Sequence, residues 1–268
     1  MGGPDGGIET AGSYAALAEY YDAIMTSGYY DYARYARALA GELADGTDHL
    51  AGGTDQPVGG TRQPVGGTDV LELGVGTGLV CEALLNLVPA TVRLTGIDHT
   101  AAMLARARAR PALRGRVRLL AQDILAPDLP GGFAAAYSVG GIWLFLRDGD
   151  GLRLGSHLPH DEDNVRGLEN LAETLRPGGC LLLAVQDAHR PFRRPMPGGL
   201  VYAQDVRDHG NGRITKDYYV LRDDTVLAHQ RSVYRLYAED DANRLLERCR
   251  FARAGTDPHG LFRRYVRT

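Results

Sequence analysis

The sequence is poor in cysteine and lacks long apolar runs. Among its 268 residues are three cysteines, Cys81, Cys180 and Cys249, each within an apolar segment. This usage argues against a disulfide framework and indicates free thiols in a reducing compartment, so we expect a cytoplasmic protein. No run approaches the ~18 apolar residues that a membrane span requires, and the Gly-rich first dozen residues do not resemble a signal peptide. We therefore expect no membrane partner.

An excess of positive charge is also lacking. Lys and Arg total 30, Asp and Glu total 33, and the formal net charge is −3. Proteins that bind nucleic acids usually carry a basic face, so this balance gives no case for a nucleic-acid partner. The hydrophobic fraction of 44% is ordinary for a globular protein, and the length fits one large α/β domain with an elaborated cap.

A glycine-rich stretch, GVGTG, is the feature around which the chain is organised. The apolar residues 70–73 before it are typical of a buried strand, and residues 79–87 after it predict a helix. Gly74 and Gly76 belong to three alternate glycines, which allow a tight turn and the close approach of a ligand.

A second strand, residues 92–97, follows the glycine turn and ends at Asp98. An acid in this place can hold both hydroxyls of a ribose, as in other doubly wound sheets. A nicotinamide-binding oxidoreductase would show a similar turn. The dinucleotide-binding fingerprint of such enzymes requires a small residue at position 79, where this chain has Leu79.

Four motifs now stand in a characteristic order. They are ELGVGTG (residues 72–78), GIDHTAAML (96–104), AQDI (121–124) and LRPGG (175–179). With them the chain resembles the class I S-adenosylmethionine-dependent methyltransferases over residues 69–186. The resemblance implies an enzyme that uses S-adenosyl-L-methionine as its cofactor.

The resemblance also implies the fold class: a doubly wound, seven-stranded, mostly parallel α/β sheet of the Rossmann-like methyltransferase type. The strands of its first part are expected at residues 70–73, 92–97, 117–120, 133–139 and 180–185. An antiparallel β insert after the fifth strand is expected from residues 200–206, 213–221 and 226–237, followed by a helix (239–249) and a hairpin near residues 257–260. This insert resembles that of the small-molecule N-methyltransferases acting on glycine and amino sugars.

The chain divides into five expected segments. They are a helical N-terminal cap (1–51), a flexible repeat linker (52–68), the cofactor-binding core (69–189), the substrate-side insert (190–237) and a C-terminal helix and hairpin of the core (238–268). The cap predicts two helices, over residues 13–44, with a break near Gly28. The linker repeats GGTDQPV and GGTRQPV, whose Gly and Pro cannot form an amphipathic helix.

The motifs of the family assign cofactor contacts residue by residue. The carboxylate of Glu72 suits the cofactor's ammonium group or the backbone of the glycine turn. Asp123 is placed to accept the hydrogens of the adenine amine, while Ile124 donates a backbone N–H to the ring. Met103 either contacts the adenine or belongs to the core. Ser138, at the end of the fourth strand, completes this part of the expected site.

Two tyrosines of the cap are further candidates. In the family a Tyr-Asp pair before the first motif lies near the cofactor, and Tyr21-Asp22 fits that pattern. Tyr14 lies upstream on the same expected helix face. Their hydroxyls can bond the methionyl carboxylate, or their rings can simply pack the cap onto the sheet.

The segment after the fourth strand, SVGGIW, bears on the substrate. Enzymes that methylate the exocyclic amine of a nucleic-acid base usually carry Asn/Asp-Pro-Pro-aromatic here, and this chain does not. Trp143 either lines a substrate pocket or belongs to the core. In the expected loop 146–163, Pro159 breaks the helix that would align His157 with a second histidine. We therefore predict no metal site and keep His157 as a substrate contact.

The substrate side lies beyond the carboxyl end of the fifth strand. His189 is the candidate general base there, because an imidazole titrates near neutral pH. Tyr202 is a candidate substrate contact. Further candidates for an acidic or hydroxylated substrate are Arg193, Arg194, Lys216 and Tyr218.

The predicted function is transfer of a methyl group to a nitrogen, rather than an oxygen or carbon, of a small metabolite. A natural-product pathway such as antibiotic biosynthesis is the expected setting. Two alternatives stay open: a nicotinamide-dependent oxidoreductase, and a non-catalytic cofactor-binding partner protein. The exposed edges of the inserted sheet suggest a homodimer.

Overall fold

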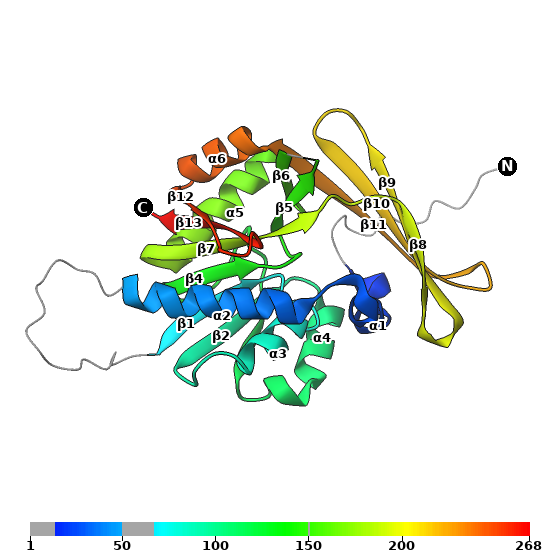
Figure 1. Cartoon of the computed structure of the whole chain (residues 1–268), viewed down its shortest axis with the longest axis horizontal. Coiled ribbons are helices and arrows are strands. Elements are labelled where there is room, and N and C mark those ends of the chain that lie inside the picture. Colours follow the sequence, from blue (N-terminus) through cyan, green and yellow to red (C-terminus); the bar gives the residue numbers. More distant parts are fainter. Residues whose placement is uncertain (1–13, 50–66, 150) are drawn as a thin grey trace, which may run out of the picture.

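The computed structural model describes residues 14–49, 67–149 and 151–268, and its centre is a mostly parallel sheet (Figure 1). The strands of this core are β1 (Thr68–Leu73), β2 (Val92–Asp98), β3 (Val117–Ala121), β4 (Phe133–Ser138), β7 (Leu175–Asp187), β12 (Phe251–Thr256) and β13 (Phe262–Arg267). The order β3-β2-β1-β4-β7 is parallel throughout, while β13 pairs antiparallel with both β7 and β12. The seven strands predicted for the core are therefore present.

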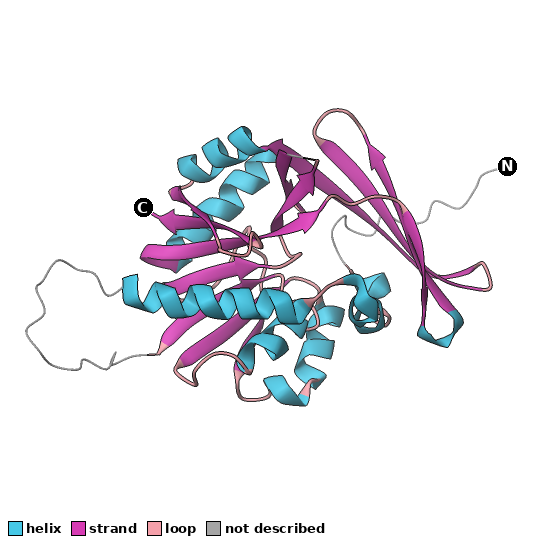
Figure 2. Ribbon diagram, in the orientation of Figure 1, coloured by secondary structure: helices cyan, strands magenta, loops and turns pink. Residues whose placement is uncertain are grey.

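Helices cover both faces of this sheet (Figure 2). They are α2 (Tyr32–His49), α3 (Leu79–Leu85), α4 (Ala101–Ala109), α5 (Asp161–Thr174) and α6 (Glu239–Arg248). Side chains alternate along β1, because successive residues of a strand point to opposite faces. Val70 packs in one buried cluster with residues of α2, α3 and α4, whereas Leu71 and Leu73 pack in another with residues of α5 and α6. The doubly wound arrangement follows from this alternation.

A second, antiparallel part of the sheet extends away from the core (Figure 1). Its strands are β5 (Trp143–Asp148), β6 (Gly151–Ser156), β8 (Phe192–Met196), β9 (Leu200–Asp208), β10 (Arg213–Arg222) and β11 (Thr225–Ala238), in the order β5-β6-β11-β10-β9-β8. A short parallel pairing of β5 with β7 joins the two parts into one sheet of 13 strands within the described residues. The whole sheet is therefore larger than the seven strands predicted.

The insert strands predicted at residues 200–206, 213–221 and 226–237 are confirmed, but the predicted loop 146–163 is wrong. Much of this segment is the β5–β6 hairpin, together with the start of α5. The hairpin forms because Phe145 and Leu154 are buried in the core and because β6 pairs with the end of β11. That pairing joins residues about 80 positions apart, which a local pattern does not reveal.

The described part of the N-terminal cap begins with short helical pieces, η1 (Ala15–Leu17), α1 (Tyr21–Ile24) and η2 (Met25–Tyr29), and continues with the long helix α2. The predicted break is confirmed at Gly28, whose φ is +85°. Leu17 and Ile24 are buried against Tyr218 and Val220 of β10. The cap therefore contacts the antiparallel sheet as well as the core.

Some predictions lie outside what the structure tests. The linker predicted at 52–68 falls outside the described residues as far as position 66, and the proposed segment boundaries stay predictions. Within the described ranges, no helix is long and apolar enough to cross a bilayer. The homodimer through the inserted sheet also stays a prediction. The outer strand of that sheet, β8, carries Arg193, Arg194 and Pro195, residue types that discourage edge-to-edge pairing.

Candidate active site

The glycine turn lies between β1 and α3, at the carboxyl end of the parallel strands. Gly74, Gly76 and Gly78 have φ values of +68°, +55° and +84°, which L side chains rarely adopt. A Cβ on Gly74 would also lie 2.9 Å from the Cα of Gly141, in the segment after β4. The turn therefore requires glycine both for its conformation and for its contact with the neighbouring segment.

Asp98 connects the second strand to this turn. One oxygen of its carboxylate accepts the N–H of Gly76 at 2.9 Å, and the other accepts the N–H of Thr100 at 2.8 Å. A carboxylate has about four lone-pair sites, so both oxygens retain capacity for hydroxyl donors. Met103 lies over the turn, because a Cβ on Gly76 would be 3.6 Å from its methyl carbon. The fold thus brings four predicted cofactor residues together.

Glu72 is buried beside the glycine turn, and its contact with the cofactor stays a prediction. Its side chain is 3% exposed, and one oxygen accepts both the hydroxyl of Tyr137 at 2.9 Å and the thiol of Cys81 at 2.7 Å. Burial raises the pKa of Glu72 to about 7, although both hydrogen bonds oppose the rise. The carboxylate thus bonds to Tyr137 of the neighbouring strand β4 and to Cys81 of α3, the helix that follows the turn.

This burial predicts how stability depends on pH. Because the pKa of Glu72 rises from 4.5 to about 7 on folding, the folded chain binds the proton more tightly. This contribution to stability is greatest below pH 4.5 and is lost as the pH rises toward 7. We expect Glu72→Gln, which keeps the acceptor oxygen, to be more stable than the native chain by about 3 kcal/mol at pH 8 but not at pH 4.5. Urea unfolding at both pH values measures this, and an equal effect at both would contradict it.

The third motif lies at the same edge of the sheet, after β3. Asp123 is exposed, and its carboxylate accepts the N–H of Leu125 at 2.9 Å. Ile124 is buried, and its carbonyl accepts the amide N–H of Asn170 at 2.8 Å. The backbone N–H of Gln122 bonds the carbonyl of Asp98 at 3.1 Å, which ties this loop to the second strand. The adenine contacts of Asp123 and Ile124 stay predictions.

Ser138, at the end of β4, is 0% exposed. Its hydroxyl has no hydrogen-bond partner among the residues that the structure describes. It lies 3.0 Å from where a Cβ on Gly141 would stand, so it is beside the segment that packs against the glycine turn. A buried hydroxyl without a partner is costly, which suits a residue that bonds a ligand.

The cap is fastened directly onto the glycine turn. The hydroxyl of Thr77 donates to the carboxylate of Asp22 at 2.5 Å, and Arg110 forms an ion pair with both Asp22 and Glu82. The Nε of Arg110 also donates to the carbonyl of Thr77 at 2.5 Å. The sequence pattern indicated Tyr21-Asp22 but gave no signal for Arg110, which lies 88 positions away from Asp22.

The bonds among Asp22, Thr77 and Arg110 are called the clasp below. We expect the clasp to control how long the cofactor stays bound. Asp22→Asn removes the charge that holds Arg110 and weakens the bond from Thr77, so the cap opens more often. Dissociation of S-adenosylhomocysteine should become about tenfold faster, as measured by stopped-flow displacement. Asp31→Asn is the matched control, because Asp31 accepts an N–H at the start of α2 and is exposed. Equal rates in the two variants would contradict the prediction.

Tyr14 meets the antiparallel sheet. Its hydroxyl lies 3.3 Å from that of Tyr218 and 3.0 Å from that of Tyr234, and the last two are 3.0 Å apart. His157 packs against Tyr234 with ring centroids 4.3 Å apart, and His189 lies 6.1 Å from the same ring. Burial lowers the pKa of His157 to about 3, so its ring is neutral. Three tyrosine hydroxyls and two imidazoles therefore gather on the inner face of this sheet.

Two aromatic residues were predicted as substrate contacts, and the structure places both of them in buried positions. Trp143 is 0% exposed, its indole N–H donates to Asn164 at 2.8 Å, and Gly167 of α5 lies directly against its ring. The prediction that Trp143 lines a substrate pocket is wrong, because it is a core residue. Tyr202 is also buried and is stacked on Tyr218 with centroids 6.4 Å apart, so it lies beside the tyrosine cluster. Its role as a substrate contact stays a prediction.

A cavity of about 430 Å³ lies beside this cluster, at the carboxyl end of β7. Tyr30, Gln186, His189 and Gln204 are among the residues lining it, and the hydroxyl of Tyr30 donates to Gln186 at 2.8 Å. The Gln186 amide nitrogen and His189 Nδ1 are buried and have no hydrogen-bond partner in the described part of the chain. These atoms are available to a bound molecule.

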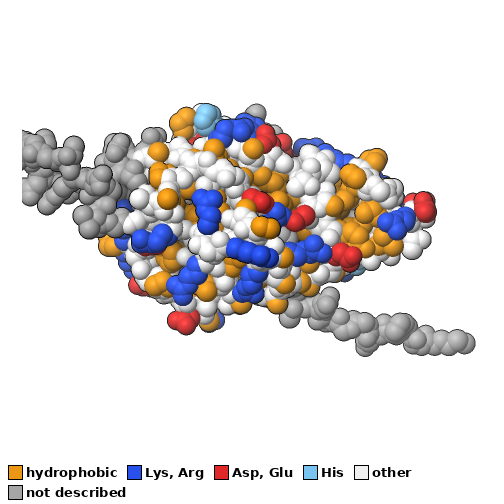
Figure 3. Space-filling model, turned by 90° about the horizontal axis from the view of Figure 1, so that it is seen from below, with side chains coloured by type: hydrophobic (Ala, Val, Ile, Leu, Met, Phe, Trp, Pro, Cys, Tyr) orange, Lys and Arg blue, Asp and Glu red, His pale blue; other side chains and the backbone are white. Residues whose placement is uncertain are grey.

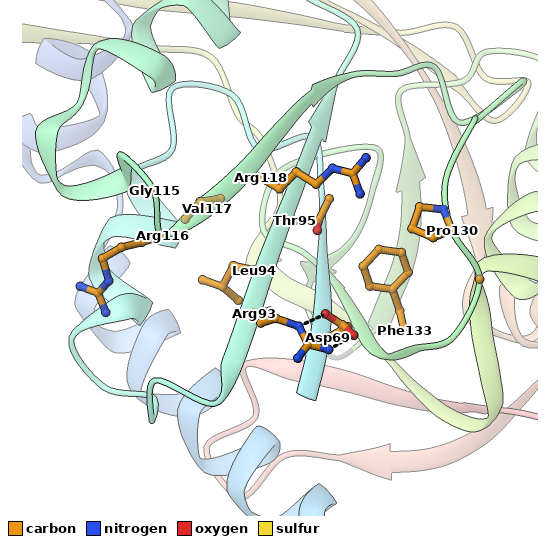
Figure 4. Close-up of a pocket in the computed structure, with 11 residues that line it drawn as sticks. Asp69, Arg93, Leu94, Thr95, Gly115, Arg116, Val117, Arg118, Pro130 and Phe133 are labelled. Atoms are coloured by element: carbon orange, nitrogen blue, oxygen red, sulfur yellow. Dashed lines mark hydrogen bonds and ion pairs between the residues drawn. The ribbon is translucent and has the colours of Figure 1, made fainter. Parts of the chain in front are cut away.

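A second cavity, of about 510 Å³, lies at the opposite edge of the sheet (Figure 4). It is lined by residues near the starts of the first four strands, and Arg93 pairs there with Asp69. Because open α/β sheets bind ligands beyond the carboxyl ends of their strands, we do not assign this cavity to the active site.

Comparisons with known proteins agree with this geometry. Residues 70–179 match a family model described as a methyltransferase domain. The chain is similar to CalS10 of Micromonospora echinaspora, an amino pentose methyltransferase solved with S-adenosylmethionine, at 18% identity and a TM-score of 0.63, over 92% of this chain and 96% of that one. No curated protein matches the chain.

Two further structures are similar over almost the whole chain. An S-adenosylmethionine-dependent methyltransferase from Clostridium acetobutylicum has 14% identity and a TM-score of 0.64, over 95% of this chain and 98% of that one. DesVI of Streptomyces venezuelae has 18% identity and a TM-score of 0.63, over 94% and 98%. At these identities, the similarity shows the fold.

Residues 70–179 therefore match a methyltransferase domain, and the similar structures share the fold that the resemblance in the sequence predicted. The match to a methyltransferase domain supports the predicted enzyme class, and CalS10, which shares the fold, was solved with S-adenosylmethionine, the cofactor predicted from the sequence. Nothing in these comparisons supports the oxidoreductase alternative. The residues at the glycine turn fit this cofactor, since the turn leaves space for a ligand and Asp98 offers acceptors to ribose hydroxyls. When bound, the cofactor supplies an electrophilic methyl group.

Proposed function

We propose that this enzyme methylates a nitrogen of a small metabolite in a natural-product pathway. The observation that carries this proposal is the polar inner face of the antiparallel sheet, where buried tyrosine, histidine and glutamine side chains lie beside the carboxyl edge of the parallel strands. A cavity of about 430 Å³ suits a small molecule rather than a polymer.

The surrounding surface gives no support for a nucleic-acid acceptor. On the face shown in Figure 3, basic side chains are interspersed with acidic and apolar ones. The net charge is −3. Recognition of nucleic acid ordinarily needs a continuous basic surface.

The choice of nitrogen is supported by likeness in architecture. CalS10, which shares the fold over 92% of this chain, is described as an amino pentose methyltransferase involved in calicheamicin biosynthesis. The neutral His157 and the neutral tyrosine hydroxyls can bond the hydroxyl and amine groups of such a molecule. His189, with Nδ1 buried and its ring at the cavity, is placed to contact the acceptor.

The experiment is a screen with S-adenosylmethionine that carries a trideuteromethyl group. Amino sugars, amino acids and their N-acetylated and deaminated counterparts are incubated with the protein and followed by mass spectrometry. We expect label in compounds with a free amine and none in their N-acetylated forms. Label that persists in the deaminated compounds would instead indicate O-methylation. No label in any compound, despite tight binding of S-adenosylhomocysteine, would favour a non-catalytic cofactor-binding protein.

A further inference from the structure

Lys216 is the single lysine of a chain whose Lys and Arg residues total 30. It lies on β10, is 0% exposed, and its Nζ forms no hydrogen bond within the described ranges. The other 29 residues of that total are therefore arginines. A lysine that is unique in the chain, fully buried and without a hydrogen-bond partner among the described residues calls for a function.

The side chains around Lys216 include tyrosine and histidine, and no carboxylate bonds to it among the residues that the structure describes. Its Nζ lies 4.0 Å from the ring centroid of Tyr234 and 6.0 Å from that of Tyr218. The titratable groups that face this cluster from the neighbouring elements are Tyr14, His157 and His189. Burial holds the pKa of Lys216 well below its usual value. Burial therefore shifts the balance of Lys216 toward its uncharged amine form.

The choice of lysine over arginine favours proton transfer. A guanidinium stays charged in proteins and binds carboxylates and phosphates with two parallel hydrogen bonds, so an anion-binding site would favour arginine. A lysine loses its charge readily when buried and can then accept a proton. Lys216 is therefore suited to proton uptake, in a chain that otherwise uses arginine.

The position of Lys216 links it to the glycine turn. The N–H of His157 donates to the carbonyl of Ile142 at 2.9 Å, directly after Gly141, which packs against Gly74. The ring of His157 contacts Tyr234, over whose face Nζ of Lys216 stands. A short series of contacts thus joins the turn, the tyrosine cluster and the lysine.

We propose that Lys216 accepts the proton released by the acceptor nitrogen during methyl transfer. This inference rests on the function proposed above. The N–C bond forms as the S–C bond breaks, the electron pair of the S–C bond stays on sulfur, and the proton passes from nitrogen to Nζ. Before the transfer the positive charge is on the sulfonium of the cofactor, and after it the charge is on the ammonium of Lys216. The sulfonium and the ammonium are therefore not present together. His189, which lines the cavity, then has a binding role instead of the role of base predicted from the sequence.

The unique lysine permits a direct test of its charge. In protein grown with 13C-labelled lysine, a single lysine Cε signal reports the protonation of Lys216 without any assignment. In the complex with S-adenosylhomocysteine, we expect this signal to show an uncharged amine at pH 8. A titration near the ordinary lysine value of about 10.4 would overturn the proposal.

A second test measures the effect of charge near the transferred methyl group. Sinefungin resembles the cofactor but carries an amine in place of the sulfonium methyl, and calorimetry compares its affinity with that of S-adenosylhomocysteine. We expect Lys216→Arg to weaken sinefungin about tenfold more than S-adenosylhomocysteine, because the fixed cation repels the ligand's ammonium.

Lys216→Met is the uncharged control and should keep the native affinity for S-adenosylhomocysteine, which shows that the fold survives. An unchanged ratio of the two affinities in Lys216→Arg would overturn the assignment. A native chain that binds S-adenosylhomocysteine but transfers no methyl group in the screen would refute the proposed function instead.

Discussion

Asp98→Asn is expected to weaken the binding of S-adenosylhomocysteine by about 100-fold. The carboxylate accepts the N–H of Gly76 and that of Thr100, which fixes it beside the glycine turn. Bonds from ribose hydroxyls to a carboxylate are charge-assisted, and the amide keeps the size of the side chain while losing the charge and one acceptor. Calorimetric titration of both proteins measures the difference.

The control for this variant is Asp123→Asn, at the same edge of the sheet. Asp123 is exposed and accepts an N–H from its own loop, so we expect a loss of about tenfold or less. An Asp98→Asn variant that binds as tightly as the native chain would exclude Asp98 from the cofactor site. A larger loss of affinity in Asp123→Asn than in Asp98→Asn would contradict the expectation that Asp98 contributes more to cofactor binding than Asp123.

Gly74→Ala is expected to have the second large effect, on stability and on cofactor binding together. The residue has a φ of +68°, and the new Cβ would lie 2.9 Å from the Cα of Gly141, which is backbone and cannot rotate away. The free energy of unfolding should fall by about 3 kcal/mol, the sum of left-handed strain and overpacking. Binding of S-adenosylhomocysteine should become too weak to measure, since the turn must move.

Gly115→Ala separates these two contributions. Gly115 has a nearly identical φ of +69°, but no atom of the described chain lies within 4 Å of a Cβ built there. It should therefore lose only about 1 kcal/mol, with cofactor affinity unchanged. Denaturant unfolding and calorimetry on both variants test the contrast. Equal losses at the two glycines would show that contact with Gly141 does not constrain the turn.

The core of the fold could be predicted because its signals are local. An apolar run followed by a glycine turn specifies β1 and the start of α3, and an acid at the end of the next run specifies Asp98. Each of these features depends on residues within a few positions of one another. The insert strands were also predictable, from alternating apolar and polar residues along β10 and β11.

What the sequence did not show depends on contacts between distant segments. The β5–β6 hairpin is stabilised by β11, and Trp143 is buried because Asn164 satisfies its N–H. The clasp between Asp22, Thr77 and Arg110 joins three separate elements. Lys216 was one of several candidate substrate contacts, and only its burial without a counterion distinguishes it.

The central claim is that the glycine turn and Asp98 hold S-adenosylmethionine. Calorimetric titration of the native chain with S-adenosylhomocysteine, and separately with NAD, tests it most directly. We predict saturable binding of S-adenosylhomocysteine with one site per chain, and no heat of binding with NAD. Binding of NAD with no response to S-adenosylhomocysteine would contradict the account.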